Sequence, residues 1–430
     1  MKSTNLQFYR SIFTKSKNIS RASYFWNVVS SAMFACQSAV MLIIITRACG
    51  QANAGIFSIS YSFASMMAFV GEYGVRKYQA SDVNEDCVFS DYFTHRIITC
   101  IVMMAASAVY CIYGLKVLGY TGSKAGVLMA VCTVKLFEAV HDVYYGRFQQ
   151  IHRLDIAAKT SSFRIILGML VYAVSLIVTQ DLLVSTWIWA AAVAAGFLLS
   201  AAVVAPEYCN TAIHFRADRL KKITSDCFPL FLGTFLLLYI GNAPKYAIDA
   251  NLTDELQARF NYIFMPVFVI GLMANFIFNP ILVDLADAWD GQKYDRFRKI
   301  ILKQILVITG LTLLAIAVAL TIGCPVLGML YNTNLSDAKG ELVVLMVGGG
   351  MLAMVNFITV VATIIRSQRH LIVGYVGVSL LALLFSGKAV MRYGLMGASA
   401  IYTLLLTVLT AVFAIVLKVC IDRGKRRKAA

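Results

Sequence analysis

The chain has 430 residues, of which 60% are hydrophobic and only 14% are charged, and its mean hydropathy is +0.75. Soluble domains average about 45–50% apolar and about 25% charged residues, so this composition excludes an ordinary soluble protein and predicts a polytopic membrane protein. The net charge of +16 is concentrated in the connectors, which indicates membrane topology and attraction to anionic lipid instead of nucleic-acid binding.

The chain begins with a polar and basic segment, residues 1–23, ahead of the first apolar run. We expect this segment to be cytoplasmic, either as an interfacial helix over residues 3–21 or as an unstructured basic arm. Because many further apolar runs follow, the first one is predicted to be an uncleaved anchor.

Twelve apolar runs are long enough to cross a bilayer, which takes about 20 residues as a helix. They are residues 24–46, 55–74, 97–118, 126–145, 163–180, 186–206, 228–248, 259–283, 300–323, 341–365, 371–388 and 395–417. No strand-like alternation competes with them, so the fold class is an all-α membrane protein. The predicted domains are an N-lobe over 24–206, a cytoplasmic linker over 207–227, a C-lobe over 228–417 and a basic cytoplasmic tail over 418–430.

An even number of spans places both termini on one side of the membrane. Most of the 38 Lys and Arg residues fall in the termini and in the connectors on that side, so the positive-inside rule makes both termini cytoplasmic. Trp26, Trp187 and Trp189 sit at predicted span ends, where indole rings favour the interface.

The connectors are too short for a soluble catalytic or nucleotide-binding domain. The "GGG" at 348–350 lacks the context of a dinucleotide site. The ten cysteines are scattered singly, without the spacing of a metal site, and act as small apolar residues. We therefore predict no catalytic residue, no metal and no cofactor, and a function carried out within the membrane.

The fourth run contains charges spaced i, i+3, i+7 at Lys135, Glu138 and Asp142. These residues share one helix face, which must meet a bundle interior or a watery cavity because lipid penalises charge. Two interpretations stay open: a Lys135–Glu138 pair that holds helices together, or groups that handle a substrate or a proton.

The seventh run ends in "YIGNAPKYAIDANL" (239–252). Gly241, Asn242 and Pro244 predict a helix break ahead of Lys245, and a broken helix at membrane depth is tolerated where it lines a cavity. The alternative is an ordinary proline stop with a lysine that reaches the interface.

Two arginines follow the first two runs. Arg47, after the first run, and Arg76, after the second, are either interfacial anchors or part of a route for an anion.

Several stretches together resemble the polysaccharide-unit flippases (Wzx-type, polysaccharide transporter family) of the multidrug/oligosaccharidyl-lipid/polysaccharide exporter superfamily. They are "TRACGQANAGIFSISYSFASM" (46–66), "YGVRKYQASDV" (73–83), "FSDYFTHR" (89–96), "GNAPKYAID" (241–249), "FNYIFMPVFVIGLMANFIFNPIL" (260–282) and "YGLMGASAIY" (393–402). The resemblance is carried by their order and spacing and not by any single motif.

The resemblance implies two six-helix lobes around a central cavity and a protein of the bacterial cytoplasmic membrane. It also implies a substrate, an undecaprenyl-diphosphate-linked oligosaccharide moved from the inner to the outer leaflet by alternating access for surface polysaccharide (exopolysaccharide) biosynthesis. The partners implied are this lipid carrier, anionic membrane lipids, a polysaccharide polymerase and glycosyltransferases.

A diphosphate needs substitute solvation to cross hydrocarbon, because an isolated buried ion costs on the order of tens of kcal/mol. The candidate phosphate partners are the cations Arg47, Arg76, Lys135 and Lys245. Glu138 and Asp142 are expected to hold these cations in place or to exchange a proton or sodium ion, and the Gly241, Asn242 and Pro244 break is a candidate hinge.

Three rivals fit parts of the sequence. A drug-type cation antiporter on the same fold would favour an anionic cavity, whereas the candidate groups contain more cations than carboxylates. An integral membrane glycan-modifying enzyme would need a large outer loop or an embedded catalytic histidine. His141 is the only histidine inside a predicted span, and we interpret it as a polar residue near the inner helix end. A scaffold protein leaves the charges of the fourth run unexplained.

Overall fold

In a computed structural model of the chain, the structure describes residues 10–82, 86–278 and 281–429, and the side chains of these residues except 272–278, 283 and 423–429. All regular structure in these ranges is helical, which confirms the all-α fold class. Predictions for residues 1–9 and for the side chains at the end of the basic tail lie outside the described part.

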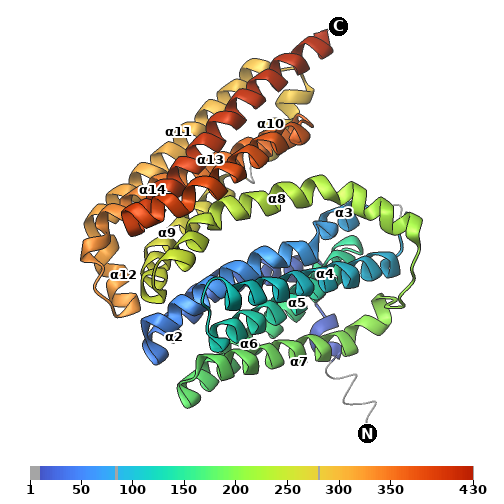
Figure 1. The fold of residues 1–430 in the computed structure, drawn as a ribbon. Helices are drawn as coiled ribbons and strands as arrows, with labels where there is room; N and C mark the ends of the chain where they lie inside the picture. Colours follow the sequence, from blue (N-terminus) through green and yellow to red (C-terminus); the bar gives the residue numbers. More distant parts are fainter. Residues whose placement is uncertain (1–9, 83–85, 279–280, 430) are drawn as a thin grey trace. The chain divides into compact units, whose positions relative to one another are not determined.

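The chain divides into two compact units, Met1–Phe235 and Leu236–Ala430, which we call unit 1 and unit 2. Unit 1 contains the helices α2 (Ile19–Glu72), α3 (Val75–Ser81), α4 (Phe89–Lys116), α5 (Gly122–Gln150), α6 (Leu154–Thr179) and α7 (Leu182–Tyr208) (Figure 1). The stretch 209–216, within the predicted linker 207–227, is not helical. The next helix, α8 (Ala217–Asn251), contains the division between the units.

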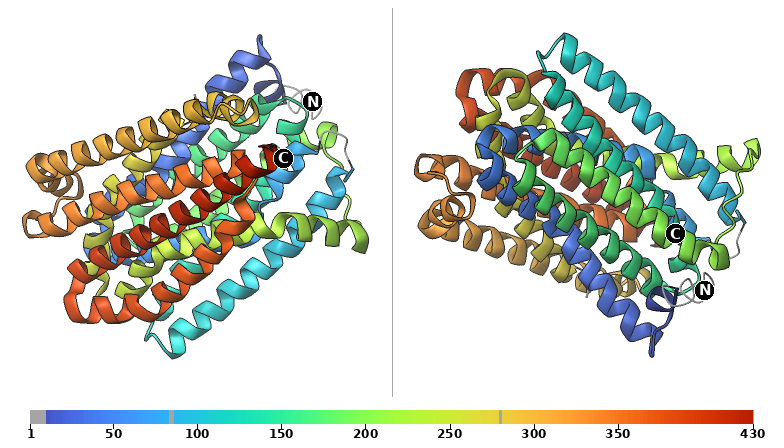
Figure 2. Two further views of the ribbon diagram at one scale, coloured as in Figure 1. Left: turned by 90° about the horizontal axis from the view of Figure 1, so that it is seen from above. Right: turned by 90° about the horizontal axis from the view of Figure 1, so that it is seen from below.

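Unit 2 continues with α9 (Asp254–Phe278), α10 (Leu282–Asp290), α11 (Tyr294–Val318), α12 (Cys324–Tyr331), α13 (Lys339–Ile364) and α14 (Ile372–Ala429). A π-helical turn, Ala319–Gly323, joins α11 to α12, and short 3-10 turns, Ser336–Ala338 and Gln368–Leu371, precede α13 and α14. Within each unit the long helices lie side by side as a bundle (Figure 2).

The number of predicted spans agrees with the described helices. The longest two are each interrupted by a glycine in a conformation outside the helical region, Gly50 (φ 84°, ψ 176°) in α2 and Gly394 (φ 56°, ψ −134°) in α14. A positive φ costs glycine little because it has no Cβ. Counting α2 and α14 as two segments each, the long helices give the twelve segments that the sequence predicts, and the chain is a multi-pass membrane protein.

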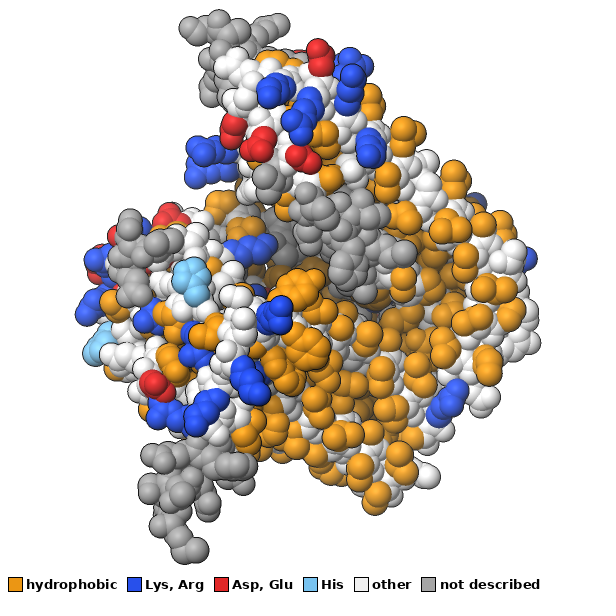
Figure 3. All heavy atoms as spheres, turned by 180° about the vertical axis from the view of Figure 1, so that it is seen from behind, with side chains coloured by type: hydrophobic (Ala, Val, Ile, Leu, Met, Phe, Trp, Pro, Cys, Tyr) orange, Lys and Arg blue, Asp and Glu red, His pale blue; other side chains and the backbone are white. Residues whose placement is uncertain are grey.

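Eight stretches of the described part are apolar and long enough to cross a membrane by composition alone. Neither α5 nor α9 is among them, and α5 is the helix that carries the predicted charged stripe. Broad areas of hydrophobic side chains cover the face seen in Figure 3, as expected of a surface in contact with lipid.

The centre of unit 1 is α5, which packs against α2, α3, α4, α6 and α7. Thr121 begins this helix, because its Oγ1 accepts from the Lys124 backbone N–H (3.2 Å) and satisfies one of the free donors of the first turn. A helix whose charged face is covered by neighbouring helices can contain charges that lipid would not tolerate.

An aromatic cluster packs beside it. Trp189 is fully buried, and its ring centroid lies 5.3 Å from that of Tyr172 and 6.2 Å from that of Phe57. The prediction of an interfacial Trp189 is therefore wrong, because α7 begins at Leu182 and places Trp189 two turns inside the span. Trp187 is 45% exposed, as an interfacial residue would be.

Residues 10–16 are bound to the ends of α6 and α7. The Ser16 hydroxyl donates to Asp155 Oδ2 (2.7 Å), Arg153 Nη2 donates to the Thr14 carbonyl (2.6 Å), and Arg10 pairs with Glu207. Residues 10–14 are helical, so this part of the N-terminal segment is a helical turn docked on protein.

The "GGG" of α13 serves close helix packing in unit 2. A Cβ on Gly348 would lie 2.6 Å from the Tyr402 ring, and one on Gly350 would lie 2.2 Å from Thr312 Oγ1. The three glycines therefore let α11, α9 and α14 approach α13, which is the central helix of this unit.

We expect Gly348→Ala to destabilise the protein by about 1–2 kcal/mol, because an overpacked core costs about 1–3 kcal/mol and the helix propensity of alanine returns up to about 1 kcal/mol. The measurement is the free energy of unfolding in mixed detergent micelles. Gly377→Ala is the matched control, since a Cβ there meets no atom within 4 Å. Equal stabilities of the two variants would contradict the packing role.

Candidate functional site

The predicted charged stripe of α5, Lys135, Glu138 and Asp142, belongs to a buried ionic network in unit 1. Its other members come from neighbouring helices: Arg76 of α3, Arg96 of α4 and Arg164 of α6. We call these six residues the charged network.

One half of the network is centred on Glu138. Its Oε2 lies 2.7 Å from Lys135 Nζ and its Oε1 lies 3.5 Å from Arg164 Nη1. Lys135 Nζ also donates to the Tyr61 hydroxyl (3.1 Å) and lies 4.3 Å from the centroid of that ring. All three ionic side chains are at most 6% exposed, so they stabilise one another in place of water.

The other half is centred on Asp142. Its Oδ2 lies 2.9 Å from Arg96 Nη2, and its Oδ1 lies 3.5 Å from Arg76 Nη1. Arg96 also donates to the Gly71 carbonyl (2.7 Å), which accepts a second hydrogen bond from Thr99 Oγ1 (2.6 Å). The fully buried guanidinium of Arg96 thus ties α4 to both α5 and the end of α2.

The backbone between α2 and α3 brings Arg76 to this carboxylate. Tyr73 (φ 50°) and Gly74 (φ 69°) are both left-handed, a pair that ends α2 and turns the chain. A Cβ on Gly74 would lie 3.2 Å from Leu230, so the turn is also packed closely. The Arg76 guanidinium lies 4.0 Å above the Tyr145 ring, in a cation–π contact.

The network has an excess of positive charge. Four cations face the two carboxylates of Glu138 and Asp142, and Glu72, at the end of α2, interacts electrostatically with Asp142 and Arg96. Even with Glu72 ionised, cations outnumber carboxylates. The Arg76 side chain is 39% exposed, whereas Lys135, Arg96 and Arg164 are buried, so Arg76 is the member of the network best placed to meet an anionic ligand.

Three of these charged residues were not predicted as site residues: Arg96, Arg164 and Glu72. The predicted spans begin at residues 97 and 163, where the apolar runs start, whereas α4 begins at Phe89 and α6 at Leu154. Arg96 and Arg164 are therefore two to three turns inside their helices, although the sequence pattern placed them at span ends.

The structure does not bring Arg47 into the network. It is exposed, three residues before the Gly50 break, whereas Arg76 follows the other end of α2. The second part of α2, residues 51–72, separates them by about 30 Å at 1.5 Å per residue.

Lys245 lies in an aromatic environment of unit 2. It is 3% exposed, and its Nζ lies 4.4 Å from the centroid of the Phe264 ring of α9. Phe264 in turn packs edge-on against Tyr402 of α14 (5.0 Å). The buried ammonium is thus held against aromatic faces, a contact typical of desolvated cations.

The predicted helix break before Lys245 is wrong. The helix α8 continues through Gly241, Asn242 and Pro244 to Asn251. A proline removes one backbone donor, and its carbonyl partner one turn earlier loses a single hydrogen bond; membrane helices tolerate this loss when neighbouring protein compensates. These three residues are therefore part of a continuous helix, and no hinge is assigned to them.

His141 is also not the helix-end residue that the sequence suggests. The helix α5 runs to Gln150, and His141 is 6% exposed with its Nε2 3.2 Å from Thr160 Oγ1 of α6. It serves as a polar contact between the two helices. In the described part of the chain, no three His, Cys, Asp or Glu side chains converge as metal ligands would.

Comparisons with known proteins show the fold. No protein-family model matches the chain. The lipid II flippase MurJ in an inward closed conformation is similar with a TM-score of 0.70 and 11% identity, over 91% of this chain and 87% of that one. An inward-facing multidrug resistance transporter of the MATE family, in the MOP superfamily, is similar with a TM-score of 0.63 and 14% identity, over 91% of this chain and 96% of that one.

One curated protein is similar in sequence. The capsular polysaccharide biosynthesis protein CapF of Staphylococcus aureus is 21% identical over 287 residues, which are 64% of this chain and 70% of that protein. The chain therefore has the fold that these exporters and the lipid II flippase share, and the predicted resemblance to the superfamily is confirmed at the level of the fold.

Proposed function

We propose that the protein is a flippase that moves a polyprenyl-diphosphate-linked oligosaccharide from the inner to the outer leaflet of the bacterial cytoplasmic membrane, for surface polysaccharide biosynthesis. The observation that carries this proposal is the excess of cations in the charged network, with Arg76 partly exposed beside Asp142. A mobile anion that has to leave water requires fixed positive charge along its route.

The chemistry of the cations fits a diphosphate. Arginine presents a planar fork of donors that binds phosphate oxygens in a bidentate manner. The Tyr145 ring and Asp142 hold the Arg76 guanidinium from two sides, so it is oriented before a ligand arrives. Lys245, in unit 2, is the second candidate phosphate partner; because it is buried here, it would meet the diphosphate in a different state of the transport cycle.

In this proposal, Lys135, Arg96 and Arg164 act indirectly. Their ion pairs with Glu138 and Asp142 compensate most of the buried charge. These pairs hold α5 in place, and with it the Asp142 carboxylate that orients Arg76. Transport proceeds by alternating access, and the potential, negative inside, favours export of an anion by about 2.3 kcal/mol per charge per 100 mV. Return of the empty protein is the step where coupling to a proton or sodium ion would enter.

The relatives support this choice of substrate. MurJ is described as a lipid II flippase and CapF as a capsular polysaccharide biosynthesis protein. The structural likeness to MATE transporters is the reason to keep a second candidate function, export of cationic drugs. A cationic drug would be repelled by the cation excess of the network, which persists even with Glu72 ionised.

Binding distinguishes the two candidates. The purified protein in lipid nanodiscs would be titrated with a polyprenyl-diphosphate oligosaccharide and, separately, with a cationic dye. We expect the diphosphate lipid to bind, and its affinity to fall with rising salt because the contact is ionic. Saturable binding of the dye without binding of the diphosphate lipid would contradict the proposal.

A further inference from the structure

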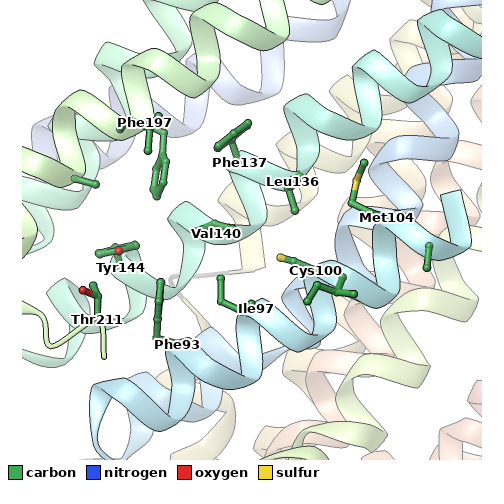
Figure 4. A pocket seen from close by; sticks show the side chains of 14 residues that line it. Phe93, Ile97, Cys100, Met104, Leu136, Phe137, Val140, Tyr144, Phe197 and Thr211 are labelled. Carbon is green, nitrogen blue, oxygen red and sulfur yellow. The ribbon is translucent and has the colours of Figure 1, made fainter. Parts of the chain in front are cut away.

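An apolar groove runs along the outside of unit 1. It has a volume of about 800 Å³, with α5 as its floor and α4 and α7 as its walls (Figure 4). Leu136, Phe137 and Val140 line it from α5, Ile97 from α4 and Phe197 from α7. Thr211 and Tyr144 contribute hydroxyls at one end, and the rest of the lining is aliphatic, aromatic and sulfur-containing side chains.

The apolar lining of the groove suits a hydrocarbon chain. It lies along helices that cross the membrane, and residues at its rim face outward, with Ile101 64% and Leu198 58% exposed. Water in such a groove would leave the apolar walls hydrated, whereas an acyl chain restores the dispersion contacts that an empty space forfeits.

The end of the groove at Thr211 has the features of a headgroup site. Figure 4 shows Thr211, Tyr144 and Phe93 together at this end and Met104 toward the other. The segment 209–216 crosses here from α7 to α4, fixed by a hydrogen bond from the His214 backbone N–H to Thr94 Oγ1 (3.1 Å).

This segment is both apolar and basic. Ile213 is 52% and Phe215 75% exposed, and the exposed Arg216 follows directly. Asp218 is the nearest carboxylate in sequence, and it pairs with Arg219 at 3.8 Å. Exposed apolar side chains next to a cation are typical of protein that lies in the interface of an anionic membrane.

We propose that the groove between α4, α5 and α7 binds one anionic glycerophospholipid of the membrane, with an acyl chain against Phe137 and Val140 and the phosphate near Arg216. This inference is independent of the transported cargo. The positive charge of Arg216 at the Thr211 end complements the phosphate of an anionic phospholipid. The predicted topology places this end in the cytoplasmic leaflet.

The site has a mechanical consequence for the charged network. At about 100° per residue, Leu136, Phe137 and Val140 lie on the side of α5 opposite the charged stripe. A bound acyl chain therefore packs against the apolar face of α5, opposite the face that carries Lys135, Glu138 and Asp142.

The test is native mass spectrometry of the purified full-length protein after exchange into mixed micelles of palmitoyl-oleoyl phosphatidylglycerol and the matched phosphatidylcholine. We expect one phosphatidylglycerol to remain bound under activation that removes the other lipids. Ala105→Trp should abolish this retention, because Ala105 lines the groove and an indole would fill it. Ala106→Trp is the matched control: Ala106 is also exposed on α4 but is not part of the lining.

Arg216→Gln tests the headgroup. We expect the preference for phosphatidylglycerol over phosphatidylcholine to fall about fivefold, the loss expected for one cation at an anionic lipid, while Lys221→Gln leaves it unchanged. Equal retention by Ala105→Trp and Ala106→Trp would overturn the groove as the binding site. Retention without headgroup preference, or a co-purified polyprenyl lipid in place of phospholipid, would overturn the proposed occupant.

Discussion

Asp142→Leu is expected to destabilise the protein by about 3–5 kcal/mol, the cost of leaving a buried charge without its partner. The charge left behind is Arg96, whose side chain is 0% exposed and whose Nη2 lies 2.9 Å from Asp142. Arg76 also loses a partner, but its side chain is 39% exposed and water compensates it. The measurement is the free energy of unfolding, followed by circular dichroism in mixed micelles with rising SDS.

The double variant Arg96→Met/Asp142→Leu is the control for this prediction. It removes both charges, and apolar replacement of a whole buried ion pair is often neutral or stabilising. The Gly71 carbonyl keeps a donor, since Thr99 Oγ1 lies 2.6 Å away. We therefore expect the double variant to recover most of the lost stability. A double variant less stable than Asp142→Leu would show that the Asp142–Arg96 pair is not the reason for the loss.

Arg76→Gln is expected to slow lipid translocation about 10- to 100-fold while leaving the unfolding free energy within about 1 kcal/mol of wild type. A hydrogen bond to a charged group contributes about 1.5–3 kcal/mol, and each 1.4 kcal/mol corresponds to about tenfold. Stability is largely retained because Arg96, at 2.9 Å, is the closer partner of Asp142. The measurement is the initial rate of transfer of a labelled lipid-diphosphate oligosaccharide across a proteoliposome membrane.

The control for Arg76 is its neighbour. Lys77 is an exposed cation on the same short helix, so Lys77→Gln changes net charge equally without touching Asp142 or Tyr145. It should transport at the wild-type rate. If Arg76→Gln and Lys77→Gln transport equally well, the role of Arg76 as a phosphate partner is wrong.

The charged stripe of α5 shows what a sequence can predict about a membrane site. Helical periodicity alone placed Lys135, Glu138 and Asp142 on one face, and the cost of charge in lipid required that face to meet a bundle interior or a watery cavity. The structure places it among the helices of unit 1, and it contains the Lys135–Glu138 pair that was one of two interpretations. The choice between a structural pair and a substrate site depends on the solvent exposure of these side chains, which a single sequence does not give.

The partners of that stripe were missed for a physical reason. Hydropathy detects the apolar part of a helix, but α4 and α6 extend two to three turns beyond it at their beginnings. Arg96 and Arg164 lie in these extensions, where long side chains usually reach water. Here they are buried because neighbouring helices cover them, and tertiary contacts of this kind leave no periodic signal in a single sequence.

Pro244 illustrates the opposite error. A proline after a glycine and an asparagine predicts the end of a helix from local conformational preference. The surrounding protein of unit 2 overrides that preference, and α8 continues to Asn251. The burial of Lys245 was also not predictable, because the aromatic rings of α9 that cover it are adjacent only in the folded chain.

The most direct test of the proposed function is translocation in proteoliposomes that contain the wild-type protein and a lipid-diphosphate oligosaccharide labelled on its sugar, with a cationic dye as the control cargo. We predict that the sugar label moves across the membrane and that the dye does not, with the movement reduced in Arg76→Gln and Lys245→Gln. Movement of the dye without movement of the sugar label would contradict the flippase and identify the protein as an exporter of cations on the same fold.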